Sequence, residues 1–352
     1  MKKEIGSIFP LYPEFFEQKG SSFNPKNRLL YSLCRETFTD IANNLCETNR
    51  TVLIPAYTCQ TVITPFEEAG WTCIFFNVFK SLRIDVNHLN NLVERHHPSL
   101  LVVHPYFGMD LDENETKALL SIKNFGVKVV VDLTQCIFSN QKLPFADYIV
   151  GSYRKWFAIP DGGFMITQNN YNINQPIEEN EPFVERQTDA MHLRGQYFLN
   201  GDKRTKQISI RLSKSADHVA EKDITPHRMS ALSCNLLEKE DKLANQQRRI
   251  SNFRYLFDNI KNSKKYAFVC SDKSLVTTAP LYFTLYVENR RDLQMKLAKE
   301  SIYAPVIWPV EDENVLISED VRYIYDHLLA IPIDQRYDEQ DMQRVVDVIN
   351  NF

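Results

Sequence analysis

Short apolar runs alternate with amphipathic stretches through the first half of the chain. The runs that have the length of a strand are at residues 51–55, 72–78, 100–103, 127–132, 147–151 and 164–167. The stretches between the first four place apolar residues at helical spacing, and Gly70 and Gly126 follow two of them. Strands that are apolar on both faces and alternate with helices are typical of a parallel sheet covered by helices. The pattern therefore predicts an α/β fold with a mostly parallel sheet.

The pattern changes after residue 168. Residues 169–222 are polar, charged and weakly periodic, which predicts an excursion of loop and helix, and residues 229–260 have the spacing of one long helix. Strand-like and helical stretches then alternate again, at residues 277–287, 290–300, 304–308, 321–328 and 340–350. This second pattern predicts a smaller α+β lobe. We expect a large domain at residues 1–240 and a small C-terminal domain at 241–352.

The composition is that of an ordinary globular protein and restricts its partners. Of 352 residues, 43% are hydrophobic and 24% are charged, with a net charge of -4, so nucleic acid is not an expected partner. No apolar stretch has the length of a signal peptide core or a membrane span, which predicts a cytoplasmic protein without a membrane partner. The seven cysteines form no C-x-x-C pair, so we expect free thiols and no metal site.

Lys155 stands in a setting that suits a covalently bound cofactor. It follows a strand-like run, comes three residues after Ser152, and precedes a Pro-Asp-Gly-Gly turn at residues 160–163. Ligands of α/β proteins bind at the carboxyl edge of the sheet, and a desolvated lysine offers a neutral amine for imine formation. A serine hydroxyl can bind a phosphate. These features predict a lysine that carries pyridoxal phosphate (PLP), although a surface lysine in a turn is the alternative.

Asp132 ends the run at 127–132, where a carboxylate is costly unless it has a partner. The protonated ring nitrogen of PLP would be such a partner, and the ion pair would make the ring an electron sink. Gln135 could then hydrogen-bond the hydroxyl of the ring. Asp132 could instead cap a helix that starts at Leu133. The joint occurrence of Asp132 and Lys155, separated by one further strand, favours the cofactor site.

Six motifs, in the same order, resemble those of the DegT-type sugar aminotransferases, which are fold-type I PLP enzymes. They are 52–58 (VLIPAYT), 103–108 (VHPYFG), 131–135 (VDLTQ), Lys155 with Gly162 and Gly163, 227–230 (HRMS), and 329–332 (LAIP) with the helical stretch from Glu339. Each motif is weak alone, but six in the right order over nearly the whole chain argue against chance. The resemblance implies a large PLP-binding lobe and a smaller C-terminal lobe.

The resemblance also implies roles for individual residues. Lys155 would hold PLP as a Schiff base and shuttle a proton, and Asp132 would pair with the ring nitrogen. The other residues implied to bind the cofactor are Gln135, Ser152, Arg35, Glu36, Thr37, Tyr57, Thr58 and Cys59. The residues implied to bind substrate are His104, Tyr106 and Arg228. Because Tyr106 and Arg228 would lie near the substrate or across a subunit boundary, we expect a homodimer.

The chain departs from the family's pattern at several positions. Ser152 is two residues closer to Lys155 than is usual. Cys34 stands where the phosphate loop usually has glycine, and Cys59 replaces the aromatic residue that stacks on the cofactor. Pro226 replaces an asparagine that reaches the phosphate of the neighbouring subunit. These changes indicate a divergent subfamily.

The expected activity is the transfer of an amino group from an amino acid, glutamate by preference, to a nucleotide-linked keto sugar. Two alternatives stay open. A PLP-dependent sugar dehydratase or lyase would need a different role for the lysine, so the presence of Lys155 favours the aminotransferase. A PLP-binding regulator or inactive family member is the second alternative, which the replacements at Cys34, Cys59 and Pro226 keep open.

Overall fold

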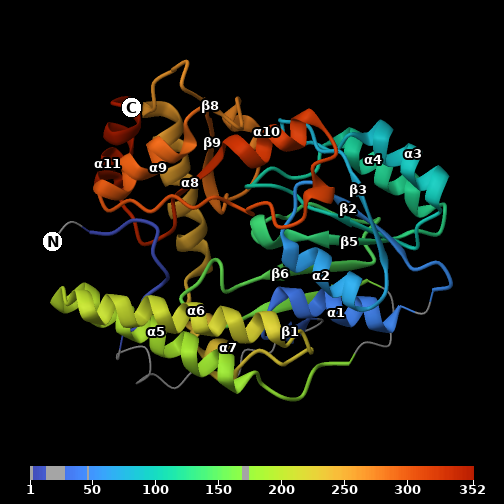
Figure 1. Ribbon diagram of the computed structural model, residues 1–352, viewed down its shortest axis with the longest axis horizontal. Helices are drawn as coiled ribbons and strands as arrows, with labels where there is room; N and C mark the ends of the chain where they lie inside the picture. The colour runs from blue at the N-terminus through green and yellow to red at the C-terminus, as the bar shows by residue number, and fades with distance from the viewer. Residues whose placement is uncertain (1–2, 13–27, 46, 169–173) are drawn as a thin grey trace. The chain divides into compact units, whose positions relative to one another are not determined.

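The computed structural model describes residues 3–12, 28–45, 47–168 and 174–352 (Figure 1). Contacts between Cα atoms divide the chain into two compact units. Among the described residues, the first unit contains 8–12, 28–45, 148–168 and 174–241, and the second contains 3–7, 47–147 and 242–352. The chain enters the second unit for the last time after Asp241, one residue beyond the end of the expected large domain. The assignment of a large and a small domain stays a prediction.

The second unit contains parallel strands at the predicted apolar runs. Strand β2 (Thr51–Pro55) pairs with β3 (Thr72–Phe76) on one side and β4 (Leu100–Val103) on the other, and β5 (Lys128–Asp132) pairs with β4. These pairings are parallel, with Leu101 opposite both Leu53 and Val129. The helices between the strands are α2 (Gln60–Glu68), α3 (Val86–His96) and α4 (Glu113–Lys123). The predicted α/β class is confirmed.

Helices α3 and α4 of this unit begin where polar side chains satisfy their first N–H groups. Asp85 accepts the N–H of His88 at 3.0 Å at the start of α3. Asp112 accepts the N–H of Glu115 at 2.8 Å, and the Glu115 carboxylate accepts the N–H of Asp112 in return. Such a capping box stabilises the first turn because the N–H groups there lack helical partners.

The C-terminal part of the second unit is a small α+β arrangement, as predicted. Its antiparallel sheet has the order β10 (Leu328–Pro332), β9 (Tyr282–Val287), β8 (Tyr266–Phe268). The helices around it are α8 (Lys242–Asn259), α9 (Arg290–Lys299), α10 (Glu319–His327) and α11 (Glu339–Asn350). Apolar side chains of α8, α9, α11 and the sheet share one core, which also includes Ile5 from the N-terminal segment.

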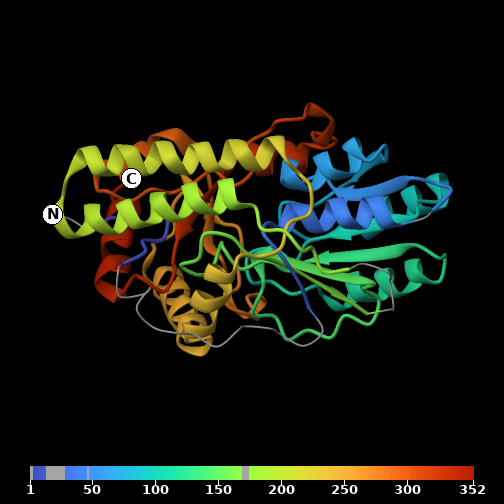
Figure 2. The ribbon, with the colours of Figure 1, turned by 90° about the horizontal axis from the view of Figure 1, so that it is seen from below.

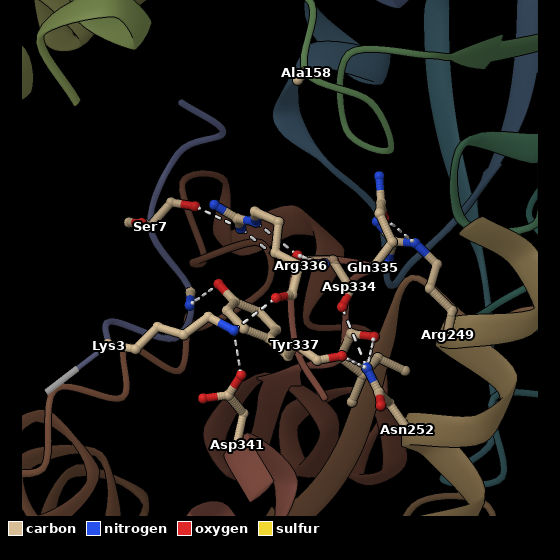
Figure 3. Close-up of polar contacts among 12 residues, drawn as sticks. Lys3, Ser7, Ala158, Arg249, Asn252, Asp334, Gln335, Arg336, Tyr337 and Asp341 are labelled. Carbon is tan, nitrogen blue, oxygen red and sulfur yellow. Dashed lines mark hydrogen bonds and ion pairs between the residues drawn. The ribbon is translucent and has the colours of Figure 1, made fainter. Parts of the chain in front are cut away.

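A polar cluster between β10 and α11 ties distant segments of this part together (Figure 3). Arg336 holds Asp334 with two hydrogen bonds, of 2.7 Å from Nε and 2.8 Å from Nη2. Asn252 of α8 donates to three backbone carbonyls of the same turn. Lys3 pairs with Asp341 at 2.5 Å. Because bidentate arginine–carboxylate pairs are geometrically specific, the cluster fixes the start of α11.

The first unit is built on an antiparallel group of strands. Strand β7 (Gly163–Thr167) lies between β1 (Leu29–Tyr31) and β6 (Tyr148–Ser152). Helix α1 (Cys34–Asn44) follows β1, and α7 (Ala231–Lys239) ends the unit. Helices α5 (Glu181–Asn200) and α6 (Lys203–Lys222) lie side by side as an antiparallel pair, which both views show (Figures 1 and 2).

Three expectations about elements were wrong. The segment 169–222 is mainly the α5–α6 pair rather than a loop with a helix, although residues 169–173 lie outside the described part. Gly201, with φ 74°, turns the chain between the two helices. The single helix expected at 229–260 is two helices, α7 and α8. Glu240, between the two helices, has an extended backbone. The negative charges of Glu240 and Asp241 are unfavourable at the C-terminus of α7 and favourable at the N-terminus of α8, so they favour a break at this point.

The third wrong expectation was a strand at 304–308. These residues form no strand, because Trp308 has a left-handed backbone with φ 56° and Pro305 has no N–H group to donate to a sheet.

Two further observations bear on the sequence. In the described part of the chain, no helix has the length and apolar character needed to cross a membrane. None of the six cysteines in this part forms a disulfide, whereas Cys46 lies outside the described residues.

Candidate active site

The carboxyl ends of β2, β4 and β5 bring three polar side chains together in the second unit. Asp132 is the last residue of β5, His104 follows β4 and Thr58 follows β2. Nδ1 of His104 lies 3.5 Å from Oδ2 of Asp132, and Nε2 lies 2.8 Å from Oγ1 of Thr58. All three side chains are buried. The strands therefore hold a buried Thr58–His104–Asp132 chain at the edge where α/β folds bind ligands.

The two oxygens of Asp132 have different surroundings. Oδ1 accepts the N–H of Thr134 at 2.8 Å, so Asp132 is the N-cap of the short 3-10 helix Leu133–Gln135. Oδ2 faces His104. The cap that the sequence left open as an alternative is present, but it uses only one oxygen. Gln135 is also buried, and its Oε1 accepts the N–H of Phe107 at 3.1 Å.

An aromatic cluster lies beside this chain of polar groups. The ring of Tyr57 lies 5.7 Å from Tyr106, 5.0 Å from Trp308 and 5.1 Å from Tyr325, centroid to centroid. Tyr106 donates its hydroxyl to the Tyr57 carbonyl at 2.6 Å, and Tyr57 donates its own to the carbonyl of Ile307 at 3.2 Å. Burial raises the pKa of Tyr57 and of Tyr106 well above the usual value. Both phenols therefore stay neutral.

Cys59 has a local role that the sequence did not suggest. It is the residue before α2, and its Sγ accepts a hydrogen bond from the Thr61 hydroxyl at 3.0 Å. The cysteine side chain has no ring and so cannot stack on a cofactor as an aromatic residue would. Tyr57, which the resemblance also assigned to cofactor binding, is fully buried in the aromatic cluster.

In the first unit, Lys155 lies in the turn after β6. Ser152 is the buried last residue of the strand, and Lys155 is exposed. The N–H groups of Tyr153 and Arg154 donate to the Gly162 carbonyl at 2.8 Å and 3.3 Å. These hydrogen bonds to Gly162 therefore close the turn that carries Lys155.

Both glycines of this pair are required by the structure. Gly162 has φ 145°, which side chains rarely allow. A Cβ on Gly163 would lie 2.6 Å from the carbonyl carbon of Leu33, next to the first residue of α1. The close approach brings the Lys155 turn and the N-terminus of α1 together within the first unit.

Asp161, between Pro160 and the glycines, links this turn to α7. Its buried carboxylate accepts the N–H of Ser230 at 2.9 Å and the Ser230 hydroxyl at 2.6 Å, and the Ser233 hydroxyl also donates to it. Burial raises the pKa of Asp161. Sequence reasoning missed this residue, although its position beside two glycines and the serine pair at the start of a helix were visible signals.

Three of the residues expected to bind the cofactor occupy the first turn of α1. Arg35 donates to the Ala220 carbonyl at 3.0 Å, and Thr37 donates its hydroxyl to the Cys34 carbonyl at 2.7 Å. The fully buried Glu36 accepts the N–H of Leu33 at 3.2 Å. These contacts are all within the first unit.

Arg228 is a half-exposed residue before α7. Its guanidinium donates to Glu179 at 2.8 Å. The predicted site residues are divided between the two units. The second unit contains Tyr57, Thr58, Cys59, His104, Tyr106, Asp132 and Gln135, and the first contains Arg35, Glu36, Thr37, Ser152, Lys155 and Arg228. Their cofactor and substrate roles stay predictions.

Sequence reasoning missed Trp308 and Tyr325 of the aromatic cluster. The two prolines around Trp308 were a visible signal that the segment is a loop.

Comparison with known proteins defines the class of fold. No protein-family model matches the sequence, and no curated protein matches it. Solved structures of aminotransferases do match over almost the whole chain, so the chain has the aminotransferase fold. The predicted resemblance to DegT-type aminotransferases is confirmed at the level of the fold.

Three solved structures illustrate the likeness. PseC of Helicobacter pylori, an aminotransferase of pseudoaminic acid biosynthesis, is 12% identical, with 99% of both chains covered and a TM-score of 0.68. A DegT DnrJ EryC1 StrS aminotransferase from Brucella abortus is 15% identical, with 92% of this chain and 85% of that chain covered and a TM-score of 0.64. NtdA from Bacillus subtilis, with bound cofactor PMP, is 13% identical, with 92% and 72% covered and a TM-score of 0.65.

Proposed function

We propose that this protein is a PLP-dependent aminotransferase of the DegT type that transfers an amino group from an amino acid to a keto sugar. The observation that carries the proposal is the buried carboxylate of Asp132 at the carboxyl end of β5, with its Oδ2 beside His104, in a chain with the aminotransferase fold. Glutamate as the donor and a nucleotide-linked sugar as the acceptor are the finer parts of the proposal.

The residues of the chain fit the cofactor. A buried carboxylate needs a positive or hydrogen-bonding partner, and Oδ2 of Asp132 faces His104 rather than a backbone donor. A protonated pyridine nitrogen suits that oxygen. Lys155 follows a strand in a turn that hydrogen bonds to the Gly162 carbonyl close, and we assign it the covalent attachment. Ser152, at the end of the same strand, is assigned to the phosphate.

When bound, PLP supplies an electron sink for negative charge at the α-carbon of the donor. The residues of the chain do the rest. Lys155 moves the proton to and from that carbon as general base and acid. Asp132 holds the ring nitrogen protonated, and His104, fixed by Thr58, orients Asp132. Arg228 is assigned to substrate binding in a homodimer.

Covalent labelling tests the proposal. Protein purified with PLP should be yellow, and borohydride should fix the cofactor to Lys155, as peptide mapping by mass spectrometry would detect. Lys155→Ala should lose the label and lower the rate of amino transfer from glutamate by about a hundredfold or more, because general acid–base groups contribute rate factors of that order. Lys142→Ala, which removes an exposed loop lysine, should keep both label and rate. A label on another lysine, or none, refutes the assignment.

A further inference from the structure

Trp308 has an unusual backbone next to the polar chain of the candidate site. Its φ is 56°, in the left-handed region, which is a genuine outlier for a bulky residue. The segment around it, between Pro305 and Pro309, is neither helix nor strand. Backbone strain of this kind is concentrated at binding and catalytic sites, where the surrounding structure maintains it. The strained backbone of Trp308 therefore indicates that this segment contributes to a binding or catalytic site.

The indole ring is held among the side chains at the carboxyl ends of β2 and β4. Its centroid lies 5.0 Å from Tyr57, 5.8 Å from His104 and 6.3 Å from Tyr106. The Tyr57 hydroxyl donates to the carbonyl of Ile307, the preceding residue. His104 in turn contacts Asp132. The Trp308 ring therefore lies next to His104, and His104 lies next to Asp132, the carboxylate proposed to hold the cofactor nitrogen.

Trp308 is not packed as a core tryptophan. Trp71 and Trp156 have 4% and 0% of their surface exposed, whereas Trp308 is only half-buried. The phenol groups of Tyr57 and Tyr106 offer no hydrogen-bond donor to a ligand, because both donate their hydroxyls to backbone carbonyls. Because Tyr57 and Tyr106 are buried, the half-buried Trp308 offers a ligand an apolar aromatic face rather than a set of hydrogen-bond donors.

We propose that Trp308 is the residue on which the ring of the sugar acceptor stacks, and that it determines specificity for the sugar; this rests on the proposed function. The face of an indole is electron-rich and attracts the weakly positive C–H groups on one face of a sugar ring. The charged carboxylate of an amino-acid donor has no such face. Trp308 should therefore act on the acceptor half of the reaction and leave the donor half unchanged.

Separate half-reactions test this inference. With the holoenzyme, stopped-flow absorbance would follow amino transfer from glutamate to the cofactor, and then from the aminated cofactor to a uridine-diphosphate-linked or thymidine-diphosphate-linked keto sugar. Trp308→Ala should raise the sugar concentration needed for half-maximal rate roughly tenfold or more. The glutamate half-reaction should stay within about twofold of wild type. Trp308→Phe keeps an aromatic face and should lie between the two.

Fluorescence gives a readout that is independent of turnover. Trp308 is the one half-buried tryptophan of the three, so acrylamide quenching should report mainly on it, and the keto sugar should protect it. Quenching in wild type that the sugar leaves unchanged would contradict the inference, and Trp308→Phe should show no sugar-dependent quenching because it removes the reporter. Trp71→Phe is the matched control, because Trp71 precedes β3 at the opposite edge of the parallel strands, and it should retain protection and both rates.

The outcomes separate this inference from the proposed function. Wild-type protein that gains no visible absorbance with PLP refutes the proposed function, and the inference with it. Normal absorbance, together with Trp308 variants that have normal acceptor rates or that slow both half-reactions equally, refutes only the role of Trp308. Circular dichroism identifies a variant that fails to fold. If Trp308→Ala does so, Trp308→Phe decides alone: a raised sugar concentration for half-maximal rate with an unchanged donor half supports the inference, and an unchanged acceptor half overturns it.

Discussion

Asp132 performs two tasks with its two oxygens. Oδ1 caps the 3-10 helix after β5, and Oδ2 faces the His104–Thr58 pair. A cap alone would not explain a histidine placed 3.5 Å from the second oxygen and itself bonded to a threonine. At the scale of the residue, the local role and the proposed chemical role are therefore compatible.

Replacement of the carboxylate by an amide separates these two tasks. Asp132→Asn keeps an oxygen for the N–H of Thr134, so the melting temperature should change little. It removes the charge that would hold the cofactor nitrogen protonated, so the rate of amino transfer should fall by about a hundredfold or more, equivalent to about 2.7 kcal/mol at about 1.36 kcal/mol per factor of ten. Steady-state kinetics and calorimetry measure the two effects.

Asp147 provides a matched control for this variant. It is also a buried carboxylate in the second unit, but it accepts the N–H of Val129 at 2.9 Å and pairs with Lys123, near the start of β5 rather than its end. Asp147→Asn should lower stability and leave the rate unchanged. An Asp132→Asn enzyme with the wild-type rate would mean that Asp132 is only a helix cap.

At the scale of the element, a buried carboxylate joins α1 to the segment before α7. Glu36 accepts the N–H of His227 at 3.1 Å, and its Oε1 lies 3.6 Å from Nδ1 of that imidazole. Asp223 lies 3.8 Å from Nε2 on the other side. Hydrogen bonding to Glu36 raises the pKa of His227, and burial raises the pKa of Glu36. The folded protein therefore binds more protons here than the unfolded chain.

The stability of the first unit should consequently depend on pH. The stabilisation from His227 is fully present below the ordinary histidine pKa of about 6.5 and is lost as pH rises through the raised pKa of the folded state. The melting temperature should fall over this range, and His227→Gln should flatten the fall. His218→Gln, at an exposed histidine of α6, should preserve it. A melting temperature that rises with pH in wild type, or an unchanged slope in His227→Gln, would contradict the expectation.

At the scale of the whole molecule, we expect a homodimer whose sites use residues of both chains. Symmetric two-fold assemblies are the commonest soluble oligomers, and the resemblance assigned Arg228 to a subunit boundary. Light scattering of the PLP-bound protein should give twice the mass of the chain, and the mass of a single chain would refute the dimer.

Mixing two inactive variants tests whether the sites are composite. Lys155→Ala and Arg228→Ala should each be inactive alone. If each site takes Lys155 from one chain and Arg228 from the other, co-expression restores one intact site per mixed dimer. Half of the dimers are mixed, so roughly a quarter of the wild-type activity should return. No recovery, with mixed dimers verified by mass spectrometry, would place both residues of a site in the same chain.

The sequence alone determined the elements whose signals are local. The strands β2, β4 and β5 were predicted from apolar runs because a strand buried on both faces requires apolar side chains at every position. Helix α4 was predicted because apolar residues recur at helical spacing over 113–125, and Gly126 follows the stretch. Asp132 was singled out because a carboxylate at the end of a buried strand is costly without a partner.

The tertiary structure alone decided what depends on contacts between distant residues. His104 beside Asp132 and Thr58 follows from three strands pairing in register. The Tyr57–Ile307 hydrogen bond joins residues 250 positions apart, so no periodicity reveals it. The segment around Trp308 was expected to be a strand because its residues are apolar. Its left-handed backbone is costly in a free chain, and it persists because the packed rings and that distant hydrogen bond hold it in place.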